Sequence, residues 1–201
     1  MFTVFLVDDD ATVIKALSRL VRGRGYNAES YTSSQTFLAE HDAAVPGCAV
    51  LDVSMPDLDG LQLQQALNAE GAARPVIFLT GNGDIPMTVR AMRAGAIDFL
   101  TKPVGAQELI AAIERAKEMD AQARQVRMEL AAVKARIATL TPREREVLSH
   151  VVSGRLNKQI AYDLGTVEKT IKFHRSSIMT KLGVRMVADL VRLAEKAGIS
   201  R

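Results

Sequence analysis

The sequence contains no tryptophan, a single cysteine and few aromatic residues. Aromatic side chains make up 4% of the 201 residues, so a hydrophobic core must be built from aliphatic side chains. One cysteine excludes an intramolecular disulfide, and Cys48 is expected to be a buried apolar residue of a cytoplasmic protein. No apolar run reaches the roughly 18 residues of a membrane-spanning helix. The first apolar run lacks a preceding basic stretch, so neither a signal peptide nor a membrane partner is expected.

Charge is distributed unevenly along the chain, although the net charge is only +3. Residues 1–105 carry a net charge of −4, whereas residues 139–201 carry +6. An acidic first half followed by a basic last third indicates two domains, the second suited to a polyanion such as nucleic acid. Because solvated charged surfaces are common, this asymmetry becomes informative only together with a motif.

Strand-like and helix-like patterns alternate through the first hundred residues. Short apolar or β-branched runs are separated by segments with helical spacing, and Gly25, Gly71 and Gly95 fall near expected helix ends. Strands that alternate with helices form a parallel sheet covered on both faces. Five strands predict an α/β doubly wound parallel sheet of the flavodoxin-like kind. The expected strands are residues 3–7, 27–31, 48–52, 76–80 and 97–101.

After Gly105 the pattern becomes wholly helical, and residues 106–138 are expected to form one extended helix that links two domains. Apolar residues recur three and four positions apart over three heptads, which is typical of a narrow helical seam. This seam either pairs two chains as a coiled coil or packs back on its own domain as a surface helix. Its members are Ala116, Met119, Ala123, Val126, Leu130, Val133, Ile137 and Leu140.

The last domain, residues 139–201, is predicted to contain four short helices. Thr141 is a favourable N-cap, Pro142 suits the first helical position, and Glu144 completes a capping box. Glycine is expected to separate the helices that follow, because a left-handed residue commonly ends a helix. The glycines concerned are Gly154, Gly165 and Gly183.

Several expected strands of the first domain end in polar residues that a parallel sheet would bring to one edge. Asp8 and Asp9 follow the first strand, and Asp52 closes the third. Thr80 closes the fourth strand and Lys102 follows the fifth. Ligands of open α/β sheets bind beyond the carboxyl ends of the strands. Carboxylates beside one lysine suit Mg²⁺ and a phosphoryl group, so Asp52 is predicted to accept phosphate.

Residues 1–120 resemble the receiver domain of bacterial two-component response regulators. The resemblance implies that a sensor histidine kinase phosphorylates Asp52, while Lys102 contacts the phosphoryl group. It also implies that Asp9, Asp52 and the Ser54 carbonyl hold Mg²⁺, with Asp8 assisting through water, and that the Lys102–Pro103 peptide is cis. Such a protein is not an enzyme beyond slow loss of its own phosphate. The matching motifs are Asp8-Asp9, Asp52, Met55-Pro56, Gly60, Thr80-Gly81 and Lys102-Pro103.

The same resemblance implies a switch pair, Thr80 and Phe99, that alters one receiver surface on phosphorylation. Ser54 and Asn82 stand where the family tunes the lifetime of the acyl phosphate. The segment 81–87 looks like the FixJ branch, in which phosphorylated receivers dimerise through the fourth helix and fifth strand. A homodimer is therefore expected on phosphorylation.

The third helix of the last domain separates an apolar face from a face of basic, hydroxyl and aromatic side chains. Cations on such a face suit phosphate or guanine, and an apolar ring suits a thymine methyl group in the major groove. An ordinary solvated face is the alternative, which Phe173 fits poorly. The apolar face comprises Val167, Ile171, Ile178 and Leu182, and the opposite face Lys169, Lys172, Phe173, Ser176 and Thr180.

Residues 140–199 resemble the LuxR-type helix-turn-helix, and the order of the two domains is that of the NarL/FixJ regulators. The match lies in residues 140–144, 157–161 and 170–175. The resemblance implies that Lys172, Phe173 and Ser176 read base edges. Further contacts to DNA, mostly to phosphates, are expected from Lys158, Thr166, Lys169, Thr170, Arg175 and Lys181.

These patterns predict a transcription factor that binds double-stranded DNA under control of Asp52, with RNA polymerase as a further candidate partner. One alternative is a phosphatase with the same crevice chemistry, although Ser54 replaces the second carboxylate that such an enzyme needs. Another alternative is a phosphorylation-independent DNA-binding regulator that uses its receiver only for dimerisation. The complete acid cluster speaks against it, because dimerisation alone does not require one.

Overall fold

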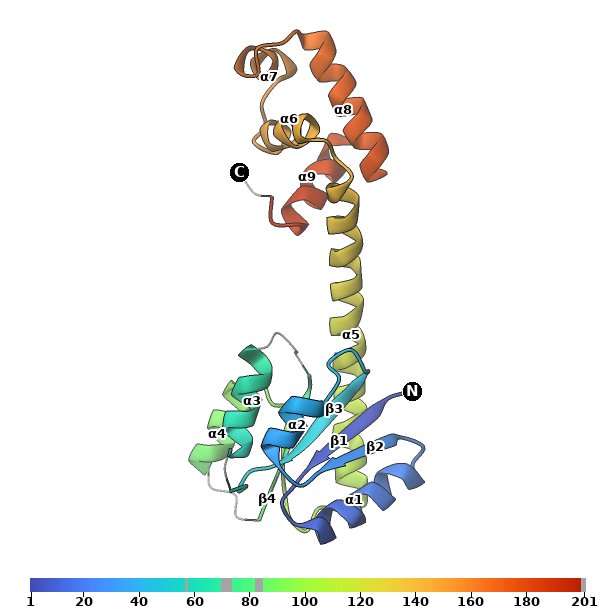
Figure 1. Ribbon diagram of the computed structural model, residues 1–201, viewed down its shortest axis with the longest axis vertical. Coiled ribbons are helices and arrows are strands. Elements are labelled where there is room, and N and C mark those ends of the chain that lie inside the picture. The colour runs from blue at the N-terminus through green and yellow to red at the C-terminus, as the bar shows by residue number, and fades with distance from the viewer. Residues whose placement is uncertain (57, 70–73, 82–84, 200–201) are drawn as a thin grey trace. The chain divides into compact units, whose positions relative to one another are not determined.

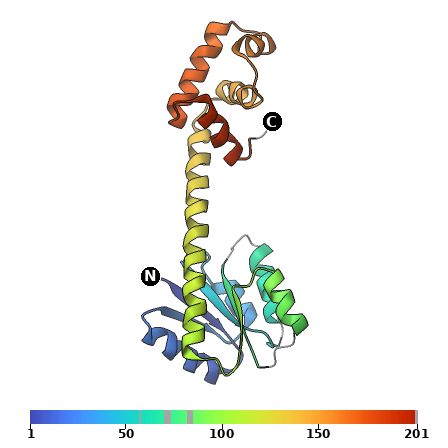
Figure 2. The same ribbon diagram turned by 180° about the vertical axis from the view of Figure 1, so that it is seen from behind.

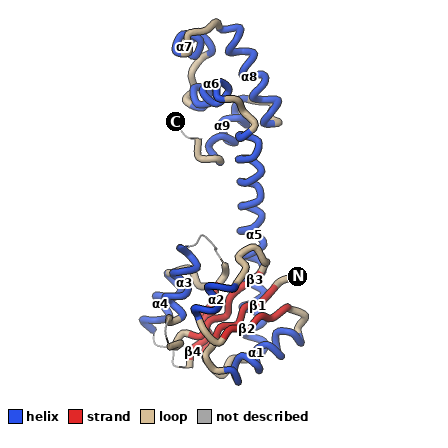
Figure 3. Tube along the Cα trace, viewed as in Figure 1, coloured by secondary structure: helices blue, strands red, loops and turns tan. Residues whose placement is uncertain are grey.

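The computed structural model describes residues 1–56, 58–69, 74–81 and 85–199, and it separates two compact units, Met1–Arg124 and Gln125–Arg201. The first unit holds a five-stranded parallel sheet flanked by helices, and the second is helical (Figures 1 and 3). The predicted fold class, a doubly wound receiver joined by a long helix to an all-helical domain, is confirmed. Among the described residues, no helix is both long enough and apolar enough to cross a membrane.

The sheet has the strand order β2-β1-β3-β4-β5, and all neighbouring strands are parallel. The predicted strands agree with the observed ones to within one residue at each end. β2 has the weakest apolar pattern because it is an edge strand, in which only Ala28 is buried. The strands are β1 (Thr3–Val7), β2 (Asn27–Tyr31), β3 (Gly47–Asp52), β4 (Val76–Thr80) and β5 (Asp98–Thr101).

Alternate residues of the central strands belong to two hydrophobic clusters, one on each face of the sheet. Val4 and Leu6 pack with α1 and α5, whereas Phe5 and Val7 pack with α2, α3 and α4. The two helical layers can be followed from opposite sides in Figures 1 and 2. The helices are α1 (Ala11–Gly23), α2 (Ser34–Glu40), α3 (Gly60–Ala69), α4 (Ile85–Arg93) and α5 (Ala106–Ala138).

Arg124 anchors α5 to the loop between α2 and β3. Its Nε donates to Asp120 Oδ2 at 2.8 Å, and its terminal nitrogens donate to the carbonyl oxygens of Ala44 and Val45, both at 2.7 Å. Asp120 is only 3% exposed, so this ion pair lies inside the first unit. Removing either partner would leave a buried charge without its counterion.

Arg74 binds the same loop from the sheet side. Its Nη2 donates to the Asp42 carbonyl oxygen at 2.8 Å, and its guanidinium lies 4.1 Å from the centre of the Phe5 ring. Burial lowers the pKa of Arg74 from its ordinary value. Two arginines therefore hold one loop through its main-chain carbonyls, and α5 is held with it.

The apolar seam predicted along α5 is divided among three environments. Ala116 is fully buried on the first unit, and Ile137 and Leu140 pack in the core of the second. Between these ends, Met119 and Val126 are exposed. The seam packs within the chain at both ends, as expected for a helix that packs on its own domain. Its middle is exposed, as a coiled coil between two chains requires.

After α5, the described part of the second unit forms four helices around an aliphatic core, as predicted from its periodicity. The glycines expected at helix ends, Gly154, Gly165 and Gly183, all have positive φ. Val167 was expected on the apolar face of the third helix but is 65% exposed, because it is the N-cap residue and precedes the first turn. The helices are α6 (Pro142–Val152), α7 (Asn157–Asp163), α8 (Glu168–Leu182) and α9 (Val187–Lys196).

Glu144 ties α6 to α8 through buried polar contacts. It completes the predicted capping box with Thr141, and its carboxylate accepts hydrogen bonds from Lys181 Nζ and Ser177 Oγ, both at 2.7 Å. The Lys181 hydrogen bond, followed by those of Ser177 and Thr141, lowers the pKa of Glu144 to about 2. The capping signal was visible in the sequence, but the cross-helix ion pair was not.

We predict that replacing Glu144 by glutamine removes an acid-sensitive part of the stability of the second unit. Because the folded-state pKa lies below the ordinary value of 4.5, the ionised carboxylate stabilises the fold above that value. This contribution is lost as pH falls from about 4.5 towards 2. Urea unfolding followed by helical circular dichroism at several pH values measures it. Glu146→Gln, which alters an exposed pair with Arg143, is the control and should leave the pH dependence unchanged.

Candidate phosphoacceptor site and nucleic-acid interface

Lys102 joins two buried carboxylates at the carboxyl edge of the sheet. Its Nζ lies 2.6 Å from Asp8 Oδ2 and 2.7 Å from Asp52 Oδ1. The side chains of Asp8 and Asp52 are 3% and 5% exposed, and that of Lys102 is 23% exposed. Three strand ends thus bring acid, acid and base together, as the sequence pattern predicted. The Lys102–Pro103 peptide is cis, also as predicted.

Main-chain hydrogen bonds hold the neighbouring strand ends in place around Asp52. The β3–β4 register sets Asp52 opposite Leu79, so Thr80 lies one residue further along the same edge and is buried. The Lys102 N–H donates to the Thr80 carbonyl oxygen at 2.7 Å. The Ser54 N–H donates to Asp52 Oδ2 at 2.8 Å, which orients the carboxylate.

The electrostatic balance of this cluster leaves negative charge uncompensated. Burial raises the pKa of the Asp8 carboxyl, and hydrogen bonds from Lys102 and the Asp10 N–H offset only part of this effect. Burial alone would lower the pKa of Lys102, but its hydrogen bonds to Asp52 and Asp8 outweigh burial and raise it. Lys102 is therefore firmly cationic, yet one cation faces two buried carboxylates.

The predicted magnesium ligands are only partly assembled. Within the described ranges, no group of three acidic, histidine or cysteine side chains is placed to hold a metal ion. Lys102 binds Asp8 and Asp52, whereas Asp9 is exposed beside them. The donor chemistry nevertheless fits a hard cation, because the available ligands are carboxylate oxygens in an environment short of positive charge. The assignment of these residues as magnesium ligands therefore remains a prediction.

Phe99 lies half-buried on β5, with its ring centre 6.0 Å from that of Phe78. It packs in the hydrophobic cluster shared with α2, α3 and α4. The proposed switch partner, Thr80, ends the adjacent strand β4. Asn82 lies outside the described residues, together with residues 83 and 84 of the segment 81–87.

The stem of Lys102 borders an apolar pocket of about 450 Å³ on the α1 side of the sheet. Val13, Leu17 and Leu20 of α1 form one wall, and Val104 forms part of another. Lysine commonly buries its methylene groups against apolar surface while its amine stays in a polar environment. The apolar wall thus supports the stem and leaves Nζ directed at the carboxylates.

The second candidate site is the exposed face of α8. Phe173 is 71% exposed, and Lys169, Lys172 and Ser176 are exposed on the same helix, as predicted. Lys172 Nζ lies 3.1 Å from Glu168 Oε1, but both side chains are largely solvated. An exposed pair of this kind contributes little and exchanges easily for a phosphate.

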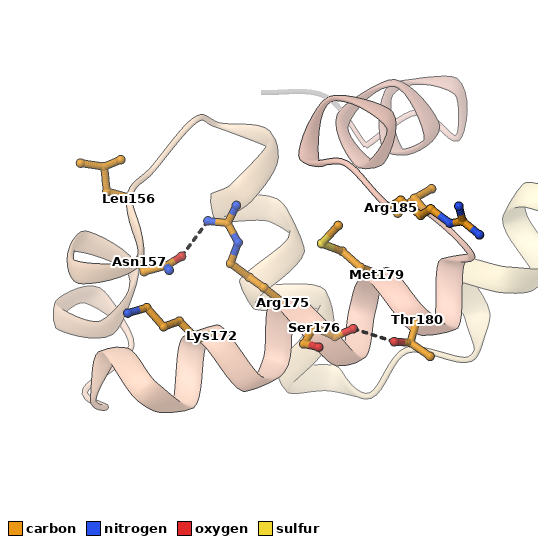
Figure 4. A pocket seen from close by; sticks show the side chains of 9 residues that line it. Leu156, Asn157, Lys172, Arg175, Ser176, Met179, Thr180 and Arg185 are labelled. Carbon is orange, nitrogen blue, oxygen red and sulfur yellow. Dashed lines mark hydrogen bonds between the residues drawn. The ribbon is translucent and has the colours of Figure 1, made fainter.

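A groove of about 590 Å³ runs between α8 and the start of α7 (Figure 4). Arg175 reaches across it and donates to Asn157 Oδ1 at 2.7 Å, which ties the two helices together. Sequence reasoning placed Arg175 at a phosphate but missed Asn157 as its partner and Arg185 as a further cation of the groove beside Lys172 and Arg175. The lining residues are Leu156, Asn157, Lys172, Arg175, Ser176, Met179, Thr180, Val184 and Arg185.

The remaining predicted DNA contacts differ in accessibility. Lys158 is exposed on α7, whereas Thr166 and Thr170 are half-buried near the start of α8. Lys181 Nζ lies 2.7 Å from the buried Glu144 carboxylate, so this lysine already has a structural ion pair. A phosphate contact by Lys181 would have to be shared with that pair.

Family comparisons agree with this division of the chain. Residues 4–114 match the model of the response regulator receiver domain, and residues 138–194 match that of bacterial regulatory proteins of the luxR family. The chain is a response regulator of the NarL/FixJ family. As a response regulator transcription factor, it combines a receiver domain, which implies a sensor kinase partner, with a DNA-binding domain.

Relatives of this response regulator align over most of their length. The response regulator protein TodT of Pseudomonas putida is 42% identical over 96% of this chain and 85% of its own. Nodulation protein W of Bradyrhizobium diazoefficiens is 43% identical over 98% and 87%. The transcriptional regulatory protein FixJ of Rhizobium meliloti is 40% identical over 98% and 97%.

Solved structures show the same relationship. The response regulator StyR matches with a TM-score of 0.82 and 46% identity, covering 97% of this response regulator and 98% of StyR. Full-length FixJ from B. japonicum matches with a TM-score of 0.59 and 36% identity over 99% and 98%. The match to the FixJ-N structure covers 59% of this chain and 94% of the FixJ-N chain, with a TM-score of 0.56 and 40% identity.

Gly60 offers a test of how tightly the acceptor strand is packed. A β-carbon at this position would lie 2.4 Å from the Asp52 carbonyl oxygen and 3.0 Å from the Phe78 ring. We predict that Gly60→Ala lowers the free energy of unfolding of the receiver by about 1–3 kcal/mol, as overpacking does. Urea denaturation of the full chain measures it. In Gly23→Ala, a β-carbon meets no atom within 4 Å in a helix, so equal losses in the two variants would contradict the packing argument.

Proposed function

We propose that phosphorylation of Asp52 by a sensor histidine kinase promotes dimerisation of this response regulator and thereby its sequence-specific binding to DNA. The observation that carries the proposal is the contact of Lys102 with both Asp8 and Asp52 at the open edge of the sheet. An acceptor carboxylate needs a fixed cation close by to stabilise the charge of the incoming phosphoryl group. A receiver used only for dimerisation has no need of this arrangement.

The proposed transfer forms a bond between phosphorus and a carboxylate oxygen of Asp52 and breaks the phosphorus–nitrogen bond of a phosphohistidine. The histidine leaves as the neutral imidazole after taking up a proton. Lys102 contacts the phosphoryl oxygens, and the Ser54 N–H keeps the carboxylate oriented. Mg²⁺, held by Asp9, Asp52 and the Ser54 carbonyl with Asp8 assisting through water, would supply the remaining positive charge.

The proposed dimer surface includes α4, which carries exposed apolar side chains. Ile85, Val89 and Met92 are 81%, 42% and 44% exposed. Phosphate at Asp52 would draw Thr80 towards it and let Phe99 move inward, which changes the surface formed by α4 and β5. A population shift towards the pairing-competent receiver follows, because phosphate stabilises that state selectively.

The proposed readout is the insertion of α8 into the major groove of double-stranded DNA. Lys172, Phe173 and Ser176 would contact base edges, while Arg175 and Lys169 would contact phosphates. Two domains held in one dimer bind two half-sites and so raise the effective concentration of the second contact. RNA polymerase is a further proposed partner, because the output of such a regulator is transcription. The proposed location is the cytoplasm.

We predict that the beryllium fluoride–Mg²⁺ mimic of the acyl phosphate converts a monomer into a dimer, as measured by light scattering. Asp52→Asn should remain monomeric with the mimic and should lose the accompanying gain in DNA affinity, since it lacks the acceptor carboxylate. If the protein were a dimer both with and without the mimic, phosphorylation would have to control a step other than dimerisation. Unchanged DNA binding and transcription in Asp52→Asn under inducing conditions would instead favour the phosphorylation-independent regulator.

The DNA-reading face can be tested separately through the salt dependence of binding. We predict that Lys169→Ala, which removes one proposed phosphate contact, lowers the slope of log affinity against log salt by about 1, whereas Phe173→Ala weakens binding by about 1–3 kcal/mol chiefly on the cognate sequence. Fluorescence anisotropy with cognate and scrambled duplexes distinguishes these effects. Arg192→Ala on α9, an exposed residue outside the groove, serves as the control and should match the wild type.

A further inference from the structure

Helix α5 carries an exposed apolar stripe along its middle. We call this stripe the α5 seam and define it as Met119, Ala123, Val126, Leu130 and Val133. Met119 is 51% and Val126 61% exposed, and the other three are half-buried. The spacing alternates between three and four residues, so the five side chains follow one line on the helix.

The α5 seam borders the side of α5 that packs on the receiver, and its exposed side chains point away from that side. Ala112, Ala116 and Asp120 are buried and mark the receiver-facing side. At about 100° per residue, Met119, Val126 and Val133 project roughly 60–100° around the helix from Ala116, whereas Ala123 and Leu130 lie within about 40° of it. A second helix can therefore cover Met119 and Val126 while Ala112, Ala116 and Asp120 keep their receiver contacts, and Arg124 lies on the other side of Ala116 from these two residues.

The charges that flank the seam favour a second copy of the same helix in parallel orientation. With Ala123 and Leu130 as heptad positions a, Glu129 occupies position g and Lys134 position e. In a parallel pair, position g of one helix faces position e, five residues on, of the other. Glu129 of one chain would thus face Lys134 of the second copy on both sides of the seam.

Within the chain, Glu129 pairs with Lys196, and this ion pair does not prevent Glu129 from pairing with Lys134 of a second copy. Lys196 Nζ lies 3.0 Å from Glu129 Oε2, and the two side chains are 59% and 47% exposed. Exposed ion pairs of this kind contribute little to stability. Glu129 can consequently replace Lys196 by Lys134 of a second copy at little cost.

We propose that the α5 seam is the surface on which two copies of this chain pair as a short parallel coiled coil. The inference rests on the proposed function, because a seam of about two heptads with alanine at one core position is too short to hold two chains alone. Pairing of the receivers supplies the effective concentration that the seam needs. The coiled coil then fixes the register of the two helices that lead to the DNA-binding domains.

Disulfide trapping with two matched cysteine variants tests the seam. Met119 lies on it, whereas Met128 is 68% exposed and points to the opposite side of α5. The native Cys48 is fully buried, and burial raises the pKa of its thiol to about 12, so the wild type is a silent background. With the beryllium fluoride–Mg²⁺ mimic, Met119→Cys should cross-link at least about tenfold faster than Met128→Cys. Without the mimic, both should cross-link slowly.

The possible outcomes separate this inference from the proposed function. Equal rates for Met119→Cys and Met128→Cys in a sample that light scattering shows to be dimeric would overturn the seam alone. Trapping of Met119→Cys only when mixed with Val133→Cys would indicate antiparallel helices and overturn the parallel register. If the mimic produced no dimer at all, the proposed dimerisation and the seam would both be wrong.

A charge exchange tests the register independently. Glu129→Lys or Lys134→Glu, each added to Met119→Cys, should slow cross-linking about two- to fivefold, because like charges would then face each other between chains. The double exchange should restore the rate. Residues five apart are not neighbours on one helix, so restoration can arise only between two chains. A double exchange as slow as the single ones would overturn the proposed pairing of Glu129 with Lys134.

Discussion

The contact between Lys102 and the carboxylates of Asp8 and Asp52 is the constraint around which the receiver is organised. It requires β1, β3 and β5 to end at the same edge, although the three residues lie far apart in the sequence. Parallel pairing meets that requirement, and the crossover helices that parallel pairing demands cover both faces. One lysine does not neutralise two buried carboxylates, so the fold keeps a site that favours additional positive charge.

Most of the fold and the acceptor cluster could be predicted because both depend on local patterns. Apolar runs identified the strands, and the charged residues that end them identified the crevice. Local patterns could not predict a polar contact between segments that lie far apart in the sequence, because no apolar run marks such a contact. Asp120 and Arg124 look like an ordinary surface pair on a helix, yet a loop some 80 positions earlier buries them.

The DNA-binding domain shows the same limit. Helical periodicity and the capping box predicted four helices and the exposed Phe173. Periodicity could not reveal that Lys181 pairs with Glu144, or that Arg175 is held by Asn157, because hydrogen-bond partners depend on how helices cross. Val167 was misplaced for a related reason: a helical wheel includes a residue that, as N-cap, precedes the helix.

The clasp formed by Arg74 and Arg124 has an evolutionary consequence. Both guanidinium groups bind main-chain carbonyls of residues 42–45 and do not depend on the side chains of that loop. Every residue type supplies a carbonyl, so the loop is free to change its composition while the clasp persists. Natural selection would then act on the two arginines and on Asp120, and the loop could diversify to meet different partners without loosening α5.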